Sequence, residues 1–391
     1  MHVATAAMKI LVLALLVQIA TAVPLSPAGR YGDSLRGPAQ PCDKAHCNLP
    51  TCRCAGTDIP GGLSPDKTPQ IVMFSFDDSL RVQDFDTYYS KAFPNRKNPN
   101  GCEIGLTFFV SGNDTDYSLV EDLYYSHNYE MADHSVDHRE PTTWWENASK
   151  DEYTHEIMDQ KSILEKWGNV PADSIRGFRG PFLVTSETEI SVLHDNKFTY
   201  EATMGTQTNY WPFTLDYKSP ICDSPSTCPN NSYPGLWLVP NINYKQSNGY
   251  PCSMIDACTA PQSEKEWLDF FMENFNLHYN DNRSPFGIYA HSAWFYYGPQ
   301  RLAALSAFLD KLATMKDVYI VTHSQMLDWV QNPTPLDKIG DFAPWKCPPR
   351  PKPRCSYKSP SCQKEYGDFS MRTCTTPCPP RYPHYGDPDG N

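Results

Sequence analysis

The sequence carries less positive than negative charge, and it lacks long apolar segments beyond its first residues. Lysine and arginine number 33 against 45 aspartates and glutamates, which gives a formal net charge of -12. This balance argues against nucleic acid and anionic membrane surfaces as partners, because both attract basic surfaces. After residue 20, no apolar run reaches the roughly 20 residues that a membrane-spanning helix needs. Internal repeats and heptads are also absent, which argues against a solenoid and a coiled coil.

The chain begins with a segment that is typical of a secretory signal. Lys9 precedes the apolar residues 10–20, and Ala20-Thr21-Ala22 has the small residues of a cleavage site. The alternative is an anchoring helix, but the apolar run is too short to span a bilayer. We therefore predict that residues 1–22 direct secretion.

Cysteine is abundant, and the number of cysteines is even. The fourteen residues lie mostly within 42–54, 222–258 and 347–378. Outside the cell they are expected to form disulfides, although the spacing does not determine which cysteines pair. A structural zinc site is the alternative for the close pairs Cys52/Cys54 and Cys374/Cys378. Four N-x-S/T sites are candidate glycan acceptors and should lie on the surface: Asn113, Asn147, Asn230 and Asn282.

Residues 66–335 alternate apolar, strand-like runs with amphipathic helices. This alternation indicates a parallel sheet covered by helices, and seven or eight repeats over roughly 270 residues favour a barrel. A Cys-rich segment (23–65) precedes this region. A Pro- and Cys-rich tail (336–391), which we expect to be stapled by disulfides or partly disordered, follows it. Residues 206–281 break the rhythm and are interpreted as an insertion. The strand candidates are 70–76, 104–110, 129–133, 175–178, 198–202, 236–239, 286–289 and 318–321.

Short polar signatures follow several of these strands. In a barrel, the carboxyl ends of the strands share one face, so we expect these side chains to lie close together. They supply the parts for metal-assisted hydrolysis: three ligands, a base, an orienting group and an acid. The signatures are Phe-Asp-Asp at 76–78, His-Ser-Val-Asp-His at 134–138, Arg-Gly-Pro-Phe at 179–182 and Tyr-Ala-His at 289–291.

The metal-binding hypothesis depends mainly on the paired histidines. His134 and His138 are four residues apart, and on a helical turn both imidazoles would face one ion. Two surface histidines are the alternative, as helix capping is for Asp77 and Asp78. A site of nitrogen and oxygen ligands without cysteine makes zinc the first choice.

The proton donor is ambiguous at this level. His291 and His323 both follow strand-like runs, and the local pattern does not choose between them. Arg179 also follows a strand, and a surface salt bridge is its alternative role.

Together the signatures resemble those of the polysaccharide deacetylases of carbohydrate esterase family 4, and specifically of the insect chitin deacetylases. The resemblance covers residues 42–335, and its specificity lies in the combination of motifs. It implies a distorted (β/α) barrel of seven or eight strands, with residues 66–335 as the catalytic domain. Further matching segments are Ile-Pro-Gly-Gly-Leu at 59–63, Asn-Gly-Cys at 100–102, Thr-Phe-Phe-Val-Ser at 107–111 and Trp-Pro-Phe-Thr-Leu-Asp-Tyr at 211–217.

The resemblance implies a role for each polar residue of the site. His291 would be the general acid, because its Tyr-Ala-His precedes a long helix as in the family, whereas His323 has no family role. The backbone N–H of Phe182 would stabilise the oxyanion. The other implied roles are Asp77 as general base, Asp78, His134 and His138 as ligands of Zn²⁺ or another divalent metal such as Co²⁺, and Arg179 as the group that orients Asp77.

One position departs from the family pattern. The family has an aspartate-serine-serine run after an aromatic residue, whereas here Tyr200 precedes Glu201-Ala202-Thr203. By resemblance, Glu201 would take the catalytic place of the aspartate that helps to keep the catalytic imidazole charged. Its extra methylene group would rearrange that contact, which puts the pKa of His291 in question.

Aromatic side chains near the motifs are candidates for stacking on sugar rings, with ordinary packing as the alternative for each. No separate chitin-binding module is recognised. The candidate substrate-binding residues are Trp144, Trp145, Pro181, Phe182, Trp211 and Trp294.

The resemblance implies a secreted, metal-dependent enzyme that removes N-acetyl groups from chitin or chitooligosaccharides. We expect a monomer in an extracellular chitinous matrix, such as a gut lining or a cuticle. Two alternatives stay open. One is a deacetylase of another polymer, such as xylan or peptidoglycan. The other is a weakly active or non-catalytic carbohydrate-binding matrix protein.

Overall fold

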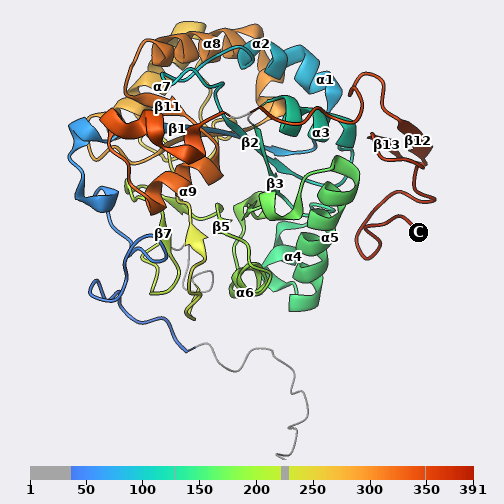
Figure 1. Cartoon of the computed structure of the whole chain (residues 1–391), viewed down its shortest axis with the longest axis horizontal. Helices are drawn as coiled ribbons and strands as arrows, with labels where there is room; N and C mark the ends of the chain where they lie inside the picture. The colour runs from blue at the N-terminus through green and yellow to red at the C-terminus, as the bar shows by residue number, and fades with distance from the viewer. Residues whose placement is uncertain (1–36, 128, 222–228, 348) are drawn as a thin grey trace, which may run out of the picture. The chain divides into compact units, whose positions relative to one another are not determined.

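The computed structural model describes residues 37–127, 129–221, 229–347 and 349–391 (Figure 1). The predicted signal (1–22) and two cysteines, Cys222 and Cys228, lie outside these residues. No helix in the described part of the chain combines the length and the apolar character that a membrane crossing requires.

Within the described residues, the largest sheet contains nine strands. They are β1 (Gln70–Asp78), β2 (Leu106–Val110), β3 (Tyr129–Asp133), β4 (Gly177–Phe178), β5 (Tyr200–Glu201), β7 (Phe213–Thr214), β8 (Trp237–Leu238), β10 (Phe286–His291) and β11 (Val318–Ile320). The order β10-β1-β2-β3-β4-β5-β8 is parallel throughout, β7 adds an antiparallel strand beside β8, and β11 pairs with the start of β1. The predicted distorted barrel is confirmed as a curled sheet whose pairing path is open.

Helices pack around this sheet in the sequence order expected of β/α units (Figure 1). A capping box of Ser149 and Glu152 begins α5, and Pro299 begins α8. The α-helices are α1 (Val82–Asp84), α2 (Ser90–Ala92), α3 (Tyr117–Ser126), α4 (Thr142–Asn147), α5 (Lys150–Gly168), α6 (Glu187–Asp195), α7 (Glu264–Tyr279), α8 (Pro299–Ala313) and α9 (His323–Gln331). The remaining strands are β6 (Gly205–Thr206) with β9 (Asn241–Ile242), and β12 (Cys362–Tyr366) with β13 (Phe369–Thr373).

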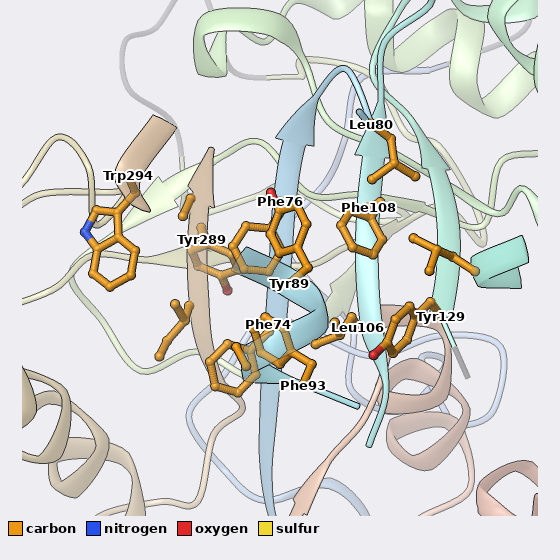
Figure 2. Packing of buried hydrophobic residues seen from close by; sticks show 14 of the residues in the cluster. Phe74, Phe76, Leu80, Tyr89, Phe93, Leu106, Phe108, Tyr129, Tyr289 and Trp294 are labelled. Carbon is orange, nitrogen blue, oxygen red and sulfur yellow. The ribbon is translucent and has the colours of Figure 1, made fainter. Parts of the chain in front are cut away.

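The two faces of β1 have different roles. Successive side chains of a strand point to opposite faces. Phe74 and Phe76 pack among aromatic residues such as Tyr89, Phe93 and Phe108 (Figure 2). The opposite face carries Ile71, Met73, Ser75 and Asp77 in that order, so the apolar residues of this face lead to two polar ones at the carboxyl end.

The insertion closes the free edge of β10. The Tyr244 hydroxyl donates to Gly287 O at 2.9 Å and accepts from Tyr289 N at 3.0 Å. Ile255 N then donates to Tyr289 O at 3.0 Å. Because unpaired backbone groups are costly to bury, these bonds fix residues 244–256 against the edge of the strand that carries His291.

Every described cysteine forms a disulfide, so the zinc alternative for the two close cysteine pairs is wrong. The tail is folded against the body: Met371 is fully buried in the main hydrophobic cluster. The disulfides join Cys42–Cys54, Cys47–Cys52, Cys102–Cys347, Cys252–Cys258, Cys355–Cys374 and Cys362–Cys378.

The candidate glycan acceptors differ in their surroundings. Asn147 and Asn230 are exposed, whereas Asn113 and Asn282 are partly buried. The Asn282 amide donates to Thr57 O at 2.8 Å and to Asn209 O at 2.6 Å. A glycan on Asn282 would therefore have to replace one of these bonds.

Candidate active site

The strand register brings the four polar signatures to one end of the sheet. Asp77 of β1 lies beside His291 of β10 in the parallel pairing. In the other direction, Val110 pairs with Asp133, and Asp133 pairs with Phe178. His134 and Arg179 directly follow those last two residues, so they emerge at the same level as Asp77 and Asp78.

Asp78, His134 and His138 form a cluster whose ligand atoms all lie within 4.8 Å of one another. The Nε2 atoms of His134 and His138 are 3.6 and 3.5 Å from Asp78 Oδ1. These distances are close to about 3.4 Å, the edge of a tetrahedron whose metal–ligand bonds are about 2.1 Å long. Two imidazoles and one carboxylate are also a donor set that Zn²⁺ and Co²⁺ accept. The residues therefore fit a divalent cation with positions left for water and substrate.

The backbone carbonyl of Arg179 orients the ring of His134. His134 Nδ1 lies 2.7 Å from Arg179 O. A carbonyl only accepts, so Nδ1 carries a proton, and Nε2 is the ring nitrogen that faces Asp78 and is placed to bind a metal. Burial alone would raise the pKa of Asp78, but the nearby imidazole of His134 and the charges of His134, His291 and His138 bring that pKa well below its usual range. Burial, followed by the charge of His134, lowers the pKa of His138. Both shifts favour the protonation states that bind a metal.

The histidine pair lies on a turn and not on a helix, which corrects the expected geometry. Residues 134–139 have no helical hydrogen-bonding pattern. Ser135 has φ of 70° and His138 has φ of 46°, and Asp78 has φ of 79°. Residues other than glycine rarely adopt such backbone φ values outside functional sites. The four-residue spacing brings the imidazoles together through this turn.

Arg179 holds Asp77 from inside the curled sheet. The guanidinium is fully buried, and its Nη1 lies 2.7 Å from Asp77 Oδ1 and 3.0 Å from Ser75 Oγ. Its Nε donates to Ala202 O at 2.8 Å, and its plane lies 4.0 Å from the ring centre of Phe109. With one oxygen bound to a fixed arginine, Asp77 presents its other oxygen to the cavity.

His291 lies opposite the cluster of Asp78, His134 and His138, and Asp256 orients it. His291 Nδ1 is hydrogen-bonded to Asp256 Oδ2, and His291 N donates to the same oxygen at 3.1 Å. Its Nε2 points toward the cluster, 3.8 Å from Asp78 Oδ2. Burial on its own would lower the pKa of His291, but the hydrogen bond to Asp256 and the charges of Asp256, Asp77 and Asp78 raise it to about 9. The imidazole therefore retains a proton at neutral pH.

Glu201 does not take the place expected for it. Its side chain is fully buried and accepts a hydrogen bond from Thr203 N. Burial raises its pKa to about 7, and the neighbouring Glu189 of α6 is a buried carboxyl group whose pKa is also raised. The carboxylate that binds His291 is Asp256, so the substitution at Glu201 does not put the pKa of His291 in question.

His323 is a core residue. It is fully buried at the start of α9, where its Nδ1 lies 3.1 Å from Thr107 Oγ1 and its ring stacks on Tyr200. Burial brings its pKa well below the usual range. Of the two histidines left open by the local pattern, His291 is the one that lines the cavity.

Most of the predicted sugar-stacking residues are packing residues. Trp145, Trp211 and Trp294 are buried. Trp211 stacks on Trp329, and Trp294 packs against Trp267. Trp144 lies against Trp145 and under the Arg139 guanidinium, and Pro181 is buried. For these five residues the packing alternative is the one that the structure supports.

The aromatic residues that reach the cavity are Phe182 and Tyr297. The cavity has a volume of 680 Å³ and is lined by Asp77, His134, Asp256 and His291 together with both rings. Phe182 is 41 % exposed and lies against His138, with 4.6 Å between ring centres. Tyr297 is 70 % exposed, and the guanidinium of Arg301 lies 4.8 Å from its ring centre.

Comparison with known proteins gives the family. Chitin deacetylase 8 of Bombyx mori is 36 % identical over 372 residues, which cover 90 % of this chain and 94 % of that relative. The chain belongs to the chitin deacetylase family. Chitin deacetylase 1 of Bombyx mori is 32 % identical over 374 residues, covering 90 % of this chain and 69 % of that relative. No protein-family model matches the chain.

A solved structure is also similar, at a level too low to carry an argument. The peptidoglycan deacetylase PdaC from Bacillus subtilis is 15 % identical, with a TM-score of 0.37, and covers 73 % of this chain and all of that one.

The site of this chitin deacetylase family member contains a residue that the sequence did not reveal. Asp256 lies in the insertion, between Cys252 and Cys258. A carboxylate between two closely spaced cysteines was the one local signal, and their spacing did not show that they pair. Its neighbour Ile255 donates a backbone hydrogen bond to Tyr289 O, a contact between distant segments that sequence spacing does not show.

Proposed function

We propose that this protein is a secreted, divalent-metal-dependent deacetylase that hydrolyses the N-acetyl groups of chitin or chitooligosaccharides. The observation that carries the proposal is the convergence of three groups on one cavity: the Asp78–His134–His138 cluster, the Asp77–Arg179 pair and the Asp256–His291 pair. Family membership supports the reaction and the substrate class. Pairing of all described cysteines supports an oxidising, extracellular environment.

Asp78, His134 and His138 would hold the cation, with Zn²⁺ as the first choice and Co²⁺ as a substitute. When bound, such a cation polarises the acetamide carbonyl and makes water more acidic. The tautomer of His134 and the ionised state of Asp78 suit this role.

Asp77 would take the proton from the attacking water. It lies next to the ligand Asp78 in the chain, and its bond to the buried Arg179 leaves one oxygen for the proton. The backbone N–H of Phe182 would donate to the developing oxyanion, and the ring of this residue lies against His138.

His291 would give its Nε2 proton to the leaving amine. An amine is a poor leaving group unless protonated, so this step requires an acid that holds its proton near neutral pH. Asp256 supplies both the orientation and the negative charge for that purpose. The products would be acetate and a glucosamine unit in the chain.

Phe182 and Tyr297 would contact sugar rings on either side of the reacting acetamide. Phe182 lies on the wall of the metal cluster, and Tyr297 follows His291 on the other wall. An exposed ring beside a polar cavity is suited to stack on a pyranose face. We therefore propose that a chain of sugars, rather than a single sugar, is the preferred substrate.

Acetate release tests the proposal directly. Purified protein is treated with a chelator, reloaded with Zn²⁺ or Co²⁺, and incubated with chitooligosaccharides. We expect the chelator to remove activity, the metals to restore it, and Asp77→Asn to lower kcat by at least about 100-fold, because a general base contributes at least that much. Asp269→Asn, at an exposed ion pair with Lys265, is the matched control.

The outcomes separate the alternatives. No acetate from the metal-loaded wild type would contradict the enzymatic function, and undiminished activity of Asp77→Asn would contradict the assigned base. Release from acetylxylan or peptidoglycan, but not from chitooligosaccharides, would replace the chitin assignment with another polymer.

A further inference from the structure

Two groups support the turn that carries the two histidines: the carboxylate of Glu156 and the backbone N–H of Gly112. We define the metal turn as residues 133–139. The carboxylate of Glu156 on α5 accepts hydrogen bonds from Val136 N at 3.1 Å and Asp137 N at 3.0 Å. Gly112 N donates to Ser135 O at 3.1 Å and to Val136 O at 3.0 Å. Because His138 sits at an unfavourable φ, its position depends on these external supports.

The C-terminal tail contacts the first support through Arg139. The Nε of Arg139 lies 2.8 Å from Glu156 Oε1, and its Nη2 lies 3.2 Å from Asp137 Oδ2. The guanidinium is enclosed between Tyr385 of the tail, 4.1 Å from its ring centre, and Trp144, at 5.1 Å. Tyr385 thus closes one side of the ion pair that anchors the metal turn.

The tail contacts the second support through Tyr382. The Tyr382 hydroxyl is buried and donates to Gly112 O at 3.0 Å, beside Tyr117, which donates to the same oxygen at 2.8 Å. These bonds fix the peptide that follows β2, and the N–H of the same glycine binds the metal turn.

The tail is itself fixed to the outer helices. Gly386 N donates to Asp159 Oδ2 of α5 at 2.8 Å, and Arg354 binds the buried carboxylate of Glu121 on α3 through two nitrogens. Two disulfides, Cys355–Cys374 and Cys362–Cys378, staple the tail. Figure 1 shows β12, β13 and the C-terminus beside α3 and α5.

We propose that the tail is a brace of the metal site: Tyr382 and Tyr385 position the metal turn and thereby set the affinity of the protein for its cation. The tail residues are positioning residues, since they act through Gly112, Arg139 and Glu156 on His134 and His138. This inference rests on the proposed metal site. It predicts that a segment far from the histidines in sequence controls metal occupancy.

Cation affinity of the apoprotein is the appropriate measurement. The full chain, stripped by a chelator, is titrated with Zn²⁺ against a competing chelator, and the visible spectrum of the Co²⁺ form reports the ligand geometry. We expect Tyr385→Ala to raise the Kd about tenfold, as loss of outer-layer partners of metal ligands does. Tyr382→Phe should raise it a few-fold, because one hydrogen bond is lost. Tyr385→Phe keeps an aromatic ring against Arg139 and should retain wild-type affinity.

A matched control separates bracing from general stability. The Tyr357 hydroxyl also ties the tail to the body, through Asp86 Oδ1 at 3.0 Å, and it lies outside the contacts described for the metal turn. Tyr357→Phe and Tyr382→Phe each remove one tail hydroxyl. Thermal unfolding of the apoproteins measures how far each loss destabilises the fold, with the larger loss expected for the buried Tyr382 bond, whereas only Tyr382→Phe should change the Kd and the Co²⁺ spectrum.

Each result decides a question. A wild type that binds no divalent cation would overturn the proposed metal-dependent function together with the brace. A wild type that binds the cation, with unchanged Kd for Tyr382→Phe and Tyr385→Ala, would overturn the brace alone. Equal increases in Kd for Tyr357→Phe and Tyr382→Phe would also overturn it, because the tail would then act only through overall stability.

Discussion

The two walls of the cavity hold their functional groups by different means. On the metal wall, a turn with unusual backbone angles is supported by Glu156, Gly112 and, through them, the tail. On the acid wall, His291 extends from a regular strand and is set by the single carboxylate of Asp256. The first arrangement has many supports around one turn, and the second has one partner.

This difference follows from what each wall must achieve. Three ligands bind one ion only if their mutual distances are kept, so several supports are needed. A proton donor needs one hydrogen bond that fixes its tautomer and one charge that keeps its proton. Changes on the metal wall should therefore alter cation affinity, whereas changes on the acid wall should alter kcat with the cation still bound.

The largest effect is expected on the acid wall. Asp256→Asn should lower kcat about 100-fold, because His291 loses the charge that holds its proton, while the Kd for Zn²⁺ stays within about twofold. The raised pKa of His291 keeps the acid protonated up to about pH 9. Without Asp256 this pKa falls, so the alkaline limb of the kcat profile should move to lower pH. Acetate release between pH 5 and 10 measures both effects.

A double substitution tests whether Asp256 acts through His291. His291→Gln alone should be at least as damaging as Asp256→Asn, and the pair together should lose no more than His291→Gln alone, because groups that act as a unit are not additive. An additive loss would show that Asp256 does not act through His291. A raised Kd for Zn²⁺ in Asp256→Asn would show that the two walls are not independent.

Predictability from the sequence divides along the same line. The metal wall was largely predictable, because β1 has the mostly apolar sequence of a buried parallel strand and Asp77-Asp78 follows at its carboxyl end. The spacing of His134 and His138 also named the two imidazoles whose nitrogens lie close to Asp78. It gave the wrong local conformation, since a turn places the rings together as well as a helix does.

The acid wall was only half predictable. His291 follows a strand and was named through the family resemblance, but Asp256 reaches it through contacts between distant segments. The resemblance pointed instead to Glu201, whose pairing within the sheet buries it. Trp211 and Trp294 were named as sugar-stacking residues but are buried in the core. Large aromatic residues near a motif also serve core packing, and proximity in sequence does not separate packing from sugar stacking.

A smaller effect is expected from Gly112→Ala on the metal wall. A Cβ atom at this position would lie 2.8 Å from Val136 O and 3.0 Å from Gln160 Oε1, so the metal turn would have to move. We expect the Kd for Zn²⁺ to rise about tenfold. The kcat of the fully loaded enzyme should fall less than in Asp256→Asn.

Gly105→Ala is the matched control for that substitution. Its Cβ would lie 2.7 Å from Thr322 N, an equally close backbone contact near α9. Both variants should unfold at lower temperature, but only Gly112→Ala should bind Zn²⁺ more weakly. Wild-type affinity in Gly112→Ala would mean that the metal turn adapts without loss, and equally weakened binding in both variants would point to general destabilisation.

The smallest effect is expected from Tyr297→Ala, which leaves the reacting groups of both walls in place. The ring is 70 % exposed and rests on Arg301, so its loss should remove stacking on a neighbouring sugar and raise KM for a chitotetraose about three- to tenfold. The kcat and the Kd for Zn²⁺ should stay unchanged. Tyr250→Ala, at a tyrosine that is 74 % exposed and absent from the residues lining the cavity, is the control. An equal rise in KM for a single N-acetylglucosamine would place the ring at the reacting sugar instead, and no change for either substrate would remove Tyr297 from the binding surface.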